Sequence, residues 1–276
     1  VKDLDLRRQL GPLFKGLIEP MIEAKHKEYL MQEKLGKELD RMKDIIPQRS
    51  LKDSIPNDFF IDPYDGALFD MTRENMINIM LNFGNRSNIK KFTEGYTFKS
   101  GMDKETLKVE SAKFEQRLWK MFEDHATADD WKFVQEIGKL FEGWRKEADI
   151  LYHNLSGISP KWIDLEPVHT KHGTFDGWYF PLIYDKLRSN INQIKEDTGS
   201  PAKLFGVNYH RASTWNKYTT ERTGYRAPVE FQTSIDQVAM RMQQTMHDIA
   251  YREAVMNAGK IIGDRKIRGA IDKHYG

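Results

Sequence analysis

The 276-residue sequence contains no cysteine. This absence excludes disulfide bonds, thiolate metal sites and cysteine nucleophiles together. It also excludes the small secreted domains that depend on several disulfides, whereas a reducing compartment or an assembled particle is compatible with it. The chain also lacks a large excess of one charge, because 43 Lys and Arg residues nearly balance 41 Asp and Glu residues and leave a net charge of +2. Any binding site for nucleic acid or for a membrane surface must therefore be local.

Long hydrophobic runs are missing as well. The first ten residues carry charges throughout, whereas a secretory signal needs an apolar stretch there. No window approaches the roughly 18 consecutive apolar residues of a membrane-spanning helix, so we expect no transmembrane segment. The chain begins with Val1 and not with Met, and we expect it to be a fragment or a processed segment of a longer protein.

Hydrophobic periodicity indicates a largely helical protein. Between residues 17 and 46 apolar residues recur at helical spacing, which predicts one long amphipathic helix or two helices that meet near Gly36. Turn-forming residues around Pro56 end this stretch. We therefore expect an N-terminal helical arm at residues 1–56 and a helical body at residues 57–276. A long amphipathic helix at a chain end commonly pairs with a partner, so we expect self-association or docking to another protein.

The first helix of the body has end signals of its own. Thr72 is suited to cap a helix over residues 76–83. Gly84 is expected to end this helix in the left-handed conformation. Asn85 and Asn88 are short amides suited to capping the end of this helix and the start of the next. We assign these two amides a structural role.

Further helices are expected at residues 105–123, 128–155 and 186–195, and a last pair begins near Val229. Aromatic and aliphatic residues recur along one face of each of the longer stretches. Asp129 and Asp130 lie at the start of the 128–155 stretch, where the helix dipole favours acids.

One stretch near the middle of the chain, residues 167–185, breaks the helical pattern. Alternating residues flank a turn at residues 171–173, which is typical of a hairpin. Trp178 and the two aromatic residues after it do not suit a solvated loop, because each buried ring removes on the order of 150–250 Å² from water. The predicted fold is therefore mainly α, a multi-helix body with one short β-hairpin or ribbon around residues 168–180, packed among the helices, and a long N-terminal helical arm.

Four residues of this stretch have side chains of the metal-ligand type: His169, His172, Asp176 and Asp185. Residues three apart on a hairpin point to opposite faces, so the two histidines do not converge on one ion. The sequence has no His-Glu-x-x-His or other zinc pattern. We therefore predict no metal site and no cofactor, and we interpret the histidines as hydrogen-bonding groups beside a turn.

Sequence motifs for catalysis are missing. The chain has no Gly-x-Ser-x-Gly elbow and no Gly-rich phosphate loop. An acid/base pair of carboxylates is conceivable, but nearly all Asp and Glu residues lie on polar helix faces beside Lys or Arg, where a solvated ion pair is the default. We predict no catalytic residue, while a cell-wall hydrolase or transglycosylase module stays open as an alternative.

Basic and aromatic residues alternate between residues 203 and 226, where Glu221 is the only acid. Cations that neutralise phosphate, interleaved with rings that stack on bases, are what a reader of single strands or of the nucleic-acid backbone needs. Two other interpretations stay open: the rings are buried against the last helices, or the arginines pair with acidic faces elsewhere. The candidate nucleic-acid-binding residues are Arg211, Trp215, Lys217, Arg222 and Arg226.

Four sequence blocks follow one another along the chain. They are Met-Thr-Arg-Glu-Asn-Met-Ile-Asn-Ile-Met-Leu-Asn-Phe-Gly-Asn-Arg-Ser-Asn from Met71, Ala-Asp-Asp-Trp-Lys-Phe-Val-Gln from Ala128, residues 173–185 with their aromatic-Pro-x-x-Tyr-Asp ending, and Glu-Arg-Thr-Gly-Tyr from Glu221 followed by the helical residues 247–254. Together they resemble the large internal virion proteins, or polyvalent proteins, of tailed bacteriophages. The resemblance covers about residues 60–276. That family usually has a second glycine where this chain has Trp178, so the bend there is expected to differ.

The resemblance implies a place inside the phage particle, entry into the host on infection and a structural part in genome delivery. It brings no catalytic residues, because relatives join these blocks to separate enzymatic modules. The implied partners are other virion proteins or copies of this chain. The chain itself is expected to be part of a longer protein, and a non-specific contact with DNA is also implied. Besides this structural ejection protein, a sequence-independent nucleic-acid-binding module and a cell-wall-degrading module stay open as alternatives.

Overall fold

The computed structural model describes residues 11–46, 48–63, 65–157, 163–182, 228–232 and 236–275. In this part of the chain the protein is mostly helical with one two-stranded antiparallel hairpin, which confirms the predicted fold class. The elements, in chain order, are the π-helical turn η1 (Phe14–Ile18), α1 (Glu19–Met42), the 3₁₀ turn η2 (Gln48–Lys52), α2 (Arg73–Leu81), α3 (Arg86–Thr97), α4 (Lys104–His125), α5 (Ala128–Gly143), α6 (Arg145–Ser156), β1 (Val168–Thr170), β2 (Gly173–Phe175), α8 (Asp236–Gly263) and α9 (Arg265–Tyr275).

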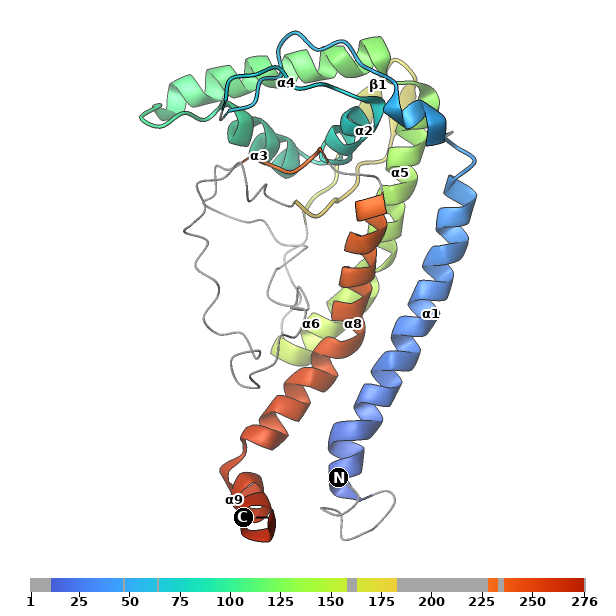
Figure 1. Cartoon of the computed structure of the whole chain (residues 1–276), viewed down its shortest axis with the longest axis vertical. Helices are drawn as coiled ribbons and strands as arrows, with labels where there is room; N and C mark the ends of the chain where they lie inside the picture. Colours follow the sequence, from blue (N-terminus) through green and yellow to red (C-terminus); the bar gives the residue numbers. More distant parts are fainter. Residues whose placement is uncertain are drawn as a thin grey trace.

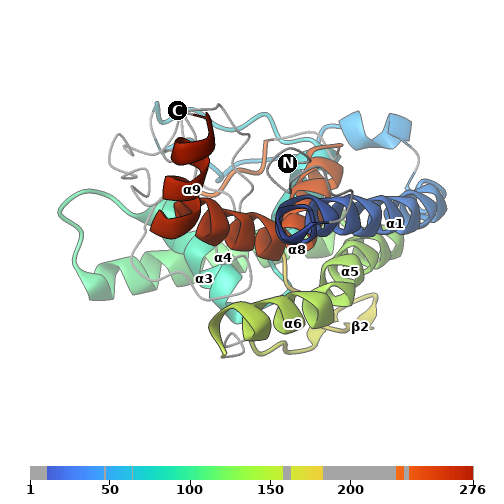
Figure 2. The ribbon, with the colours of Figure 1, turned by 90° about the horizontal axis from the view of Figure 1, so that it is seen from below.

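The helices form a head and a stalk (Figure 1). Helices α2, α3 and α4 make the head at one end of the molecule, and α1 and α8 run side by side away from it. Helix α5 leads from the head past α1 to α6, α6 packs on α8, and these four helices make the stalk. Seen from below, α8 lies between α9 and α6 (Figure 2). None of the described helices is both long and apolar enough to cross a membrane.

Helix α1 is a single helix that continues through Gly36, so the first of the two sequence alternatives is correct. A glycine inside a helix costs only about 1 kcal/mol relative to alanine, and burial of Leu35 and Met42 against the rest of the stalk opposes this cost. The helix packs on α8 of the same chain. The need for an outside partner is therefore weaker than the sequence indicates, and the division of the chain at residue 56 stays a prediction.

Side-chain caps set where the helices begin. Thr72 and Thr127 each form a capping box at the start of α2 and α5, with Asn75 and Asp130 as the reciprocal partners. Asn85 caps α3 by accepting a hydrogen bond from the backbone N–H of Asn88. These findings confirm Thr72 as a cap and Asn85 as a capping amide.

The stretch 128–155 is not one helix, because α5 ends at Gly143 and α6 begins at Arg145. Trp144 between them is 5% exposed and has φ −97° and ψ −1°, outside regular helix geometry. Its ring packs against Phe141 with a centroid distance of 5.8 Å, so burial of the indole accompanies the change of direction. The helix expected at residues 186–195 lies outside the described residues.

The hairpin has the turn expected from the sequence. Val168 pairs with Phe175 and Thr170 pairs with Gly173, which leaves Lys171 and His172 as the two-residue turn. Gly173 has φ of +130°, a conformation that side chains rarely adopt. The hairpin is followed by an extended aromatic segment, residues 176–182, which we call the ribbon.

The core of the head is built around Phe60, which is fully buried. Its ring lies between 4.8 and 5.0 Å, centroid to centroid, from the rings of Phe69, Tyr96, Phe114 and Phe231. These rings come from the loop before α2, from α3 and α4, and from the segment that precedes α8. One aromatic cluster therefore joins parts of the chain that are far apart in sequence.

Replacing Phe60 with Ala is expected to lower the free energy of unfolding by about 3–5 kcal/mol, because the change removes the ring at the centre of the cluster and leaves a cavity. Urea denaturation followed by circular dichroism measures the effect. The matched control is Ile61→Ala, since Ile61 is the next residue and is 46% exposed. Equal losses in the two variants would contradict this account of the core.

Candidate functional site

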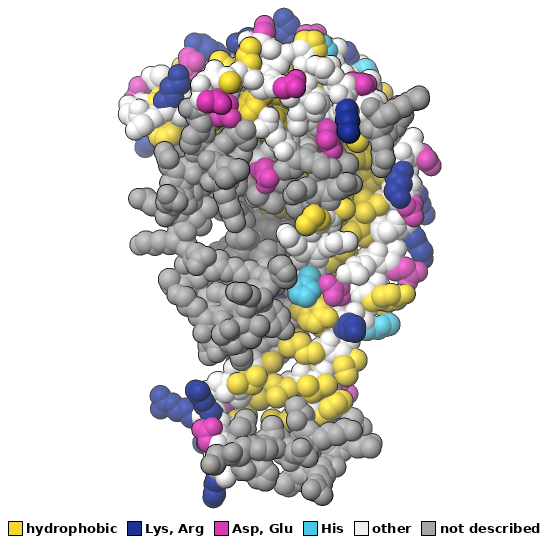
Figure 3. Space-filling view, viewed as in Figure 1, with side chains coloured by type: hydrophobic (Ala, Val, Ile, Leu, Met, Phe, Trp, Pro, Cys, Tyr) yellow, Lys and Arg dark blue, Asp and Glu magenta, His cyan; other side chains and the backbone are white. Residues whose placement is uncertain are grey.

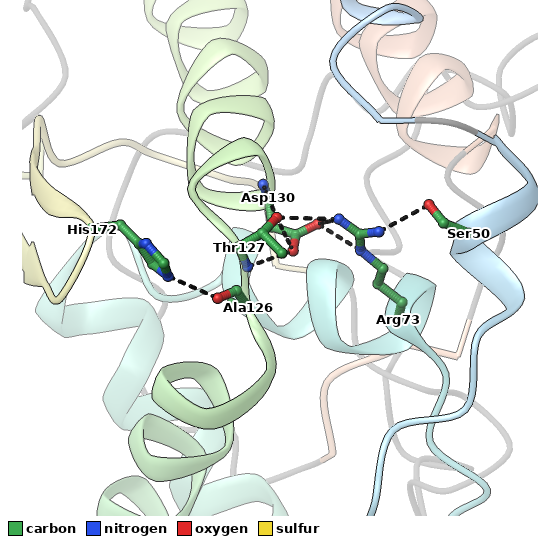
Figure 4. Close-up of polar contacts among 6 residues, drawn as sticks. All are labelled: Ser50, Arg73, Ala126, Thr127, Asp130 and His172. Atoms are coloured by element: carbon green, nitrogen blue, oxygen red, sulfur yellow. Dashed lines mark hydrogen bonds and ion pairs between the residues drawn. The ribbon is translucent and has the colours of Figure 1, made fainter.

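The starts of α2 and α5 meet at a polar cluster that we call the junction, made of Ser50, Arg73, Thr127 and Asp130 (Figure 4). Arg73 Nε donates to Asp130 Oδ1 at 2.9 Å, and Arg73 Nη1 donates to Ser50 Oγ at 2.9 Å. Arg73 Nη2 lies 2.9 Å from Asp130 Oδ1 and 3.2 Å from Thr127 Oγ1. The guanidinium therefore joins α2, α5 and η2 at one point.

Asp130 has no exposed side-chain surface. Its Oδ2 accepts hydrogen bonds from both the backbone N–H and the hydroxyl of Thr127, each at 2.8 Å, while Oδ1 accepts from Arg73. Each of these donors replaces hydration that the carboxylate loses on burial. Both oxygens are used for positioning, so the arrangement does not offer Asp130 as a base to a substrate.

The tip of the hairpin caps the C-terminal end of α4. The Lys171 ammonium donates to the carbonyl of Glu123, and His172 Nε2 lies 2.9 Å from the carbonyl oxygen of Ala126 (Figure 4). The last carbonyls of a helix lack partners within the helix, and a cation there also complements the helix dipole. These contacts hold the hairpin beside the junction, because Ala126 comes one residue before Thr127, the N-cap of α5.

The ribbon is held in the body by Trp178, which is 1% exposed. Its indole Nε1 donates to the carbonyl of Leu81 at 2.8 Å, and its backbone N–H donates to the carbonyl of Gly84 at 3.0 Å. A Cβ atom at Gly84 would lie 2.4 Å from the indole, and one at Gly138 would lie 2.2 Å from Trp178 Cβ. We call this place, between two glycines of different segments, the Trp178 socket.

The expectation for Gly84 is wrong. Among the described glycines the left-handed conformation occurs at Gly66, Gly101, Gly157 and Gly173, and not at Gly84. Gly84 is needed for space, since the Trp178 indole occupies the volume that a side chain would fill. Sequence reasoning assigned the glycine to the end of its own helix because the residue that lies on it is 94 positions away.

Asn85 does more than cap α3, whereas the Asn88 side chain does not cap the helix and only its backbone N–H takes part in the Asn85 cap. Asn85 Nδ2 donates to the carbonyl of Trp178 at 3.1 Å, and Asn88 Nδ2 donates to the carbonyl of Phe180 at 2.7 Å. Both amides are buried, and an extended segment inside a protein needs donors of this kind for its carbonyls. The sequence held a signal for this role at Asn85, because a capping amide uses its oxygen and leaves its NH₂ group free to donate.

Replacing Gly138 with Ala is expected to lower the free energy of unfolding by about 1–3 kcal/mol, because the new methyl group overlaps Trp178. Trp178→Ala is expected to cost about 3–5 kcal/mol through the cavity it leaves. The double variant should lose less than the sum, since removing the indole removes the overlap. Urea denaturation of the four proteins measures the coupling.

The matched control for Gly138 is Gly143→Ala at the end of the same helix, where no atom lies within 4 Å of an added Cβ. That change is expected to be neutral or to stabilise by up to about 1 kcal/mol. Strict additivity of Gly138→Ala and Trp178→Ala would contradict the socket.

A second polar cluster, the stalk cluster, lies where α1 and α6 pack on α8 and consists of Glu28, Tyr152, His247, Asp248 and Arg252. His247 Nδ1 lies 3.0 Å from Glu28 Oε1, which links α8 to α1. Arg252 Nη1 donates to the Tyr152 hydroxyl at 2.9 Å, which links α8 to α6. Arg252 Nη1 is also 3.7 Å from Asp248 Oδ2. Asp248 is 1% exposed, and its Oδ1 has no hydrogen-bond partner within the described part of the chain.

Burial raises the pKa of Asp248 to about 6, and the nearby Arg252 and His247 oppose only part of this effect. The ordinary value is 3.8, so the folded protein binds this proton more tightly than the unfolded chain. The resulting stabilisation is fully present below pH 4 and is lost as the pH rises through 6. At about 1.4 kcal/mol per unit, the pKa difference corresponds to roughly 3 kcal/mol.

Asp248→Asn removes this titration, so we expect the stability of the variant relative to the wild type to improve by up to about 3 kcal/mol between pH 4 and pH 7.5. Urea denaturation at both pH values measures the change. Asp44→Asn, at an exposed position, is the control and should show no such shift. Parallel pH profiles for Asp248→Asn and the wild type would contradict the assignment.

The five candidate nucleic-acid-binding residues, Arg211, Trp215, Lys217, Arg222 and Arg226, lie outside the described residues. The structure therefore neither brings them together nor separates them. Their role stays a prediction, as do the two competing interpretations of the 203–226 segment.

The hairpin histidines are hydrogen-bonding groups, as interpreted from the sequence. His169 Nδ1 lies 3.0 Å from Thr174 Oγ1, His172 contacts the Ala126 carbonyl, and Asp176 Oδ2 accepts from Gln135 Nε2 at 3.3 Å. Asp185 lies outside the described residues. In the described ranges, no three His, Asp or Glu side chains converge as metal ligands would.

The junction, the Trp178 socket and the amides of Asn85 and Asn88 make their contacts within the protein. Their donors and acceptors hold helix ends and the ribbon backbone, and the sequence signals for them, caps and glycines, were assigned to local roles. Comparison of the chain with known protein families, with curated proteins and with solved structures finds no match.

Proposed function

We propose that the chain is a structural segment of an internal virion protein of a tailed bacteriophage, carried inside the particle and delivered into the host with the genome. The chain itself performs no catalysis in this proposal. The sequence blocks that resemble that family supply the starting point. A structural role is supported by what the polar residues of these blocks bind.

In the first three blocks the polar residues bind other parts of the chain; the structure describes residues 71–88, 128–135 and 173–182 of these blocks. Arg73, Asn85 and Asn88 of the first block bind Asp130 of the second block and the ribbon of the third. A catalytic or ligand site would instead aim such groups at an open pocket. The motif residues thus act as the connections of a scaffold, and this is the observation that carries the proposal.

Association with other virion proteins, or with copies of the same chain, belongs to this proposal. The side of α1 that does not face α8 exposes Ile22, Tyr29 and Leu30, by 57%, 62% and 51%. Their i, i+7 and i+8 spacing places them within one sector of the helix. Single exposed apolar residues are ordinary, but three in one sector of a stalk helix suit a neighbour in an assembly.

The test is made on purified particles of the phage that encodes the chain. We expect an antibody against the chain to detect it in intact particles, protected from added protease, and to find it depleted from the particle shells after DNA release is triggered. The major capsid protein is the control and should remain with the shells. Absence from intact particles, or an unchanged amount in emptied shells, would contradict the proposal.

A peptidoglycan turbidity assay addresses the cell-wall alternative. The proposal expects no clearing by the chain. Clearing that disappears on replacement of a single buried carboxylate would favour a hydrolase or transglycosylase instead.

A further inference from the structure

Helix α9 carries a local excess of positive charge. It contains Arg265, Lys266, Arg268 and Lys273 against one acid, Asp272, and thus carries a net charge of +3 with His neutral. The whole chain carries +2, so the other 265 residues together carry −1. The eleven residues of α9 are therefore a basic stretch of the chain, and residues 203–226, with a net charge of +4, are another.

The cations of α9 differ from four lysines elsewhere in the described part of the chain that are held in ion pairs. Lys37, Lys43, Lys113 and Lys139 each form an ion pair with an acid about one turn away. None of the ion pairs between described residues involves the four cations of α9, and all four are exposed. Their charge is available to a partner.

The four cations share one side of the helix. At 100° per residue they fall within a sector of about 160°, which also includes Gly269 and the one acid of the helix, Asp272. No atom lies within 4 Å of a Cβ built at Gly269, so the middle of the basic side is open. In the space-filling view, Lys and Arg side chains gather at the end of the molecule where Figure 1 places α9 (Figure 3). The basic side is thus accessible, and it forms no ion pair with the described part of the chain.

We propose that the basic side of α9 is a contact surface for the phosphate backbone of double-stranded nucleic acid, read without regard to sequence. From Arg265 to Lys273 the helix rises about 12 Å. Duplex DNA carries one negative charge per about 1.7 Å of its axis, so this length faces several phosphates. The surface consists of other residues than those of the 203–226 segment, and the inference does not depend on the virion proposal.

The composition of α9 favours a phosphate backbone over a lipid surface. Helices that lie in a membrane interface insert Trp, Phe or Leu side chains from their apolar side. Helix α9 contains none of these three residue types, and Ile267 and Ile271 are its only large aliphatic residues. Its attraction to a partner is therefore mainly electrostatic. Such attraction suits a nucleic-acid backbone, because cations that neutralise phosphates release the counterions condensed on them.

The test uses the full chain and a fluorescein-labelled duplex of mixed sequence, about 20 base pairs long, in an anisotropy titration from about 50 to about 200 mM KCl. The variant replaces all four cations, Arg265→Gln, Lys266→Gln, Arg268→Gln and Lys273→Gln. We expect the wild type to bind with an affinity that falls steeply with salt. The slope of log affinity against log salt should become shallower by about 3 to 4 in the variant, at about 0.9 for each phosphate that the variant no longer neutralises.

The matched control replaces Lys37, Lys43, Lys113 and Lys139 with Gln, which removes the same charge from exposed but paired positions. It should leave the slope within about one unit of the wild type. Circular dichroism confirms that both variants are folded. Equal slope changes in the two variants, or no binding of the wild type at low salt, overturns the proposal.

Two further arms identify the surface and the ligand. A slope change in a variant with Gln at Arg211, Lys217, Arg222 and Arg226, but not in the α9 variant, would place duplex binding at the 203–226 segment and overturn the inference. Binding to phosphatidylglycerol vesicles that disappears in the α9 variant, with duplex binding unchanged, would assign α9 to lipid and also overturn it.

Discussion

The position of Trp178 is the constraint on which the rest of the structure depends. Its indole fills the space left by Gly84 and Gly138, and its two N–H groups bond to carbonyls at the end of α2. The ribbon carbonyls then receive the amides of Asn85 and Asn88. Burial of a large ring is favourable only if the backbone beside it keeps its hydrogen bonds, so apolar packing and polar satisfaction are achieved together here.

The junction extends this constraint to the ends of the helices. Arg73 and Asp130 form a buried ion pair, and such pairs add little net stability unless further hydrogen bonds compensate for lost hydration. Thr127 and Ser50 supply these hydrogen bonds. The pair therefore serves to set how α2 and α5 meet, and with the hairpin tip on the end of α4 it joins the head to the start of the stalk.

The stalk follows a different rule. Its helices meet through an apolar seam together with Asp248, a carboxylate whose burial raises its pKa to about 6. One of its oxygens is without a partner in the described part of the chain, and this is a real cost to stability near neutral pH. Head and stalk thus contrast: the carboxylate of the junction has donors for both oxygens, whereas that of the stalk does not.

Local patterns in the sequence determined the mainly helical class, the caps at Thr72 and Asn85 and the turn at Lys171 and His172, because each depends on residues within a few positions of one another. Only the tertiary structure decided why Gly84 is a glycine, which partner Asp130 has and what the Asn85 amide binds. In each of these cases the partner lies more than 50 positions away, and a single sequence carries no signal that pairs such distant residues. The break at Trp144 belongs to the same group, since burial of its ring against the assembled core, and not helix propensity, goes with the turn.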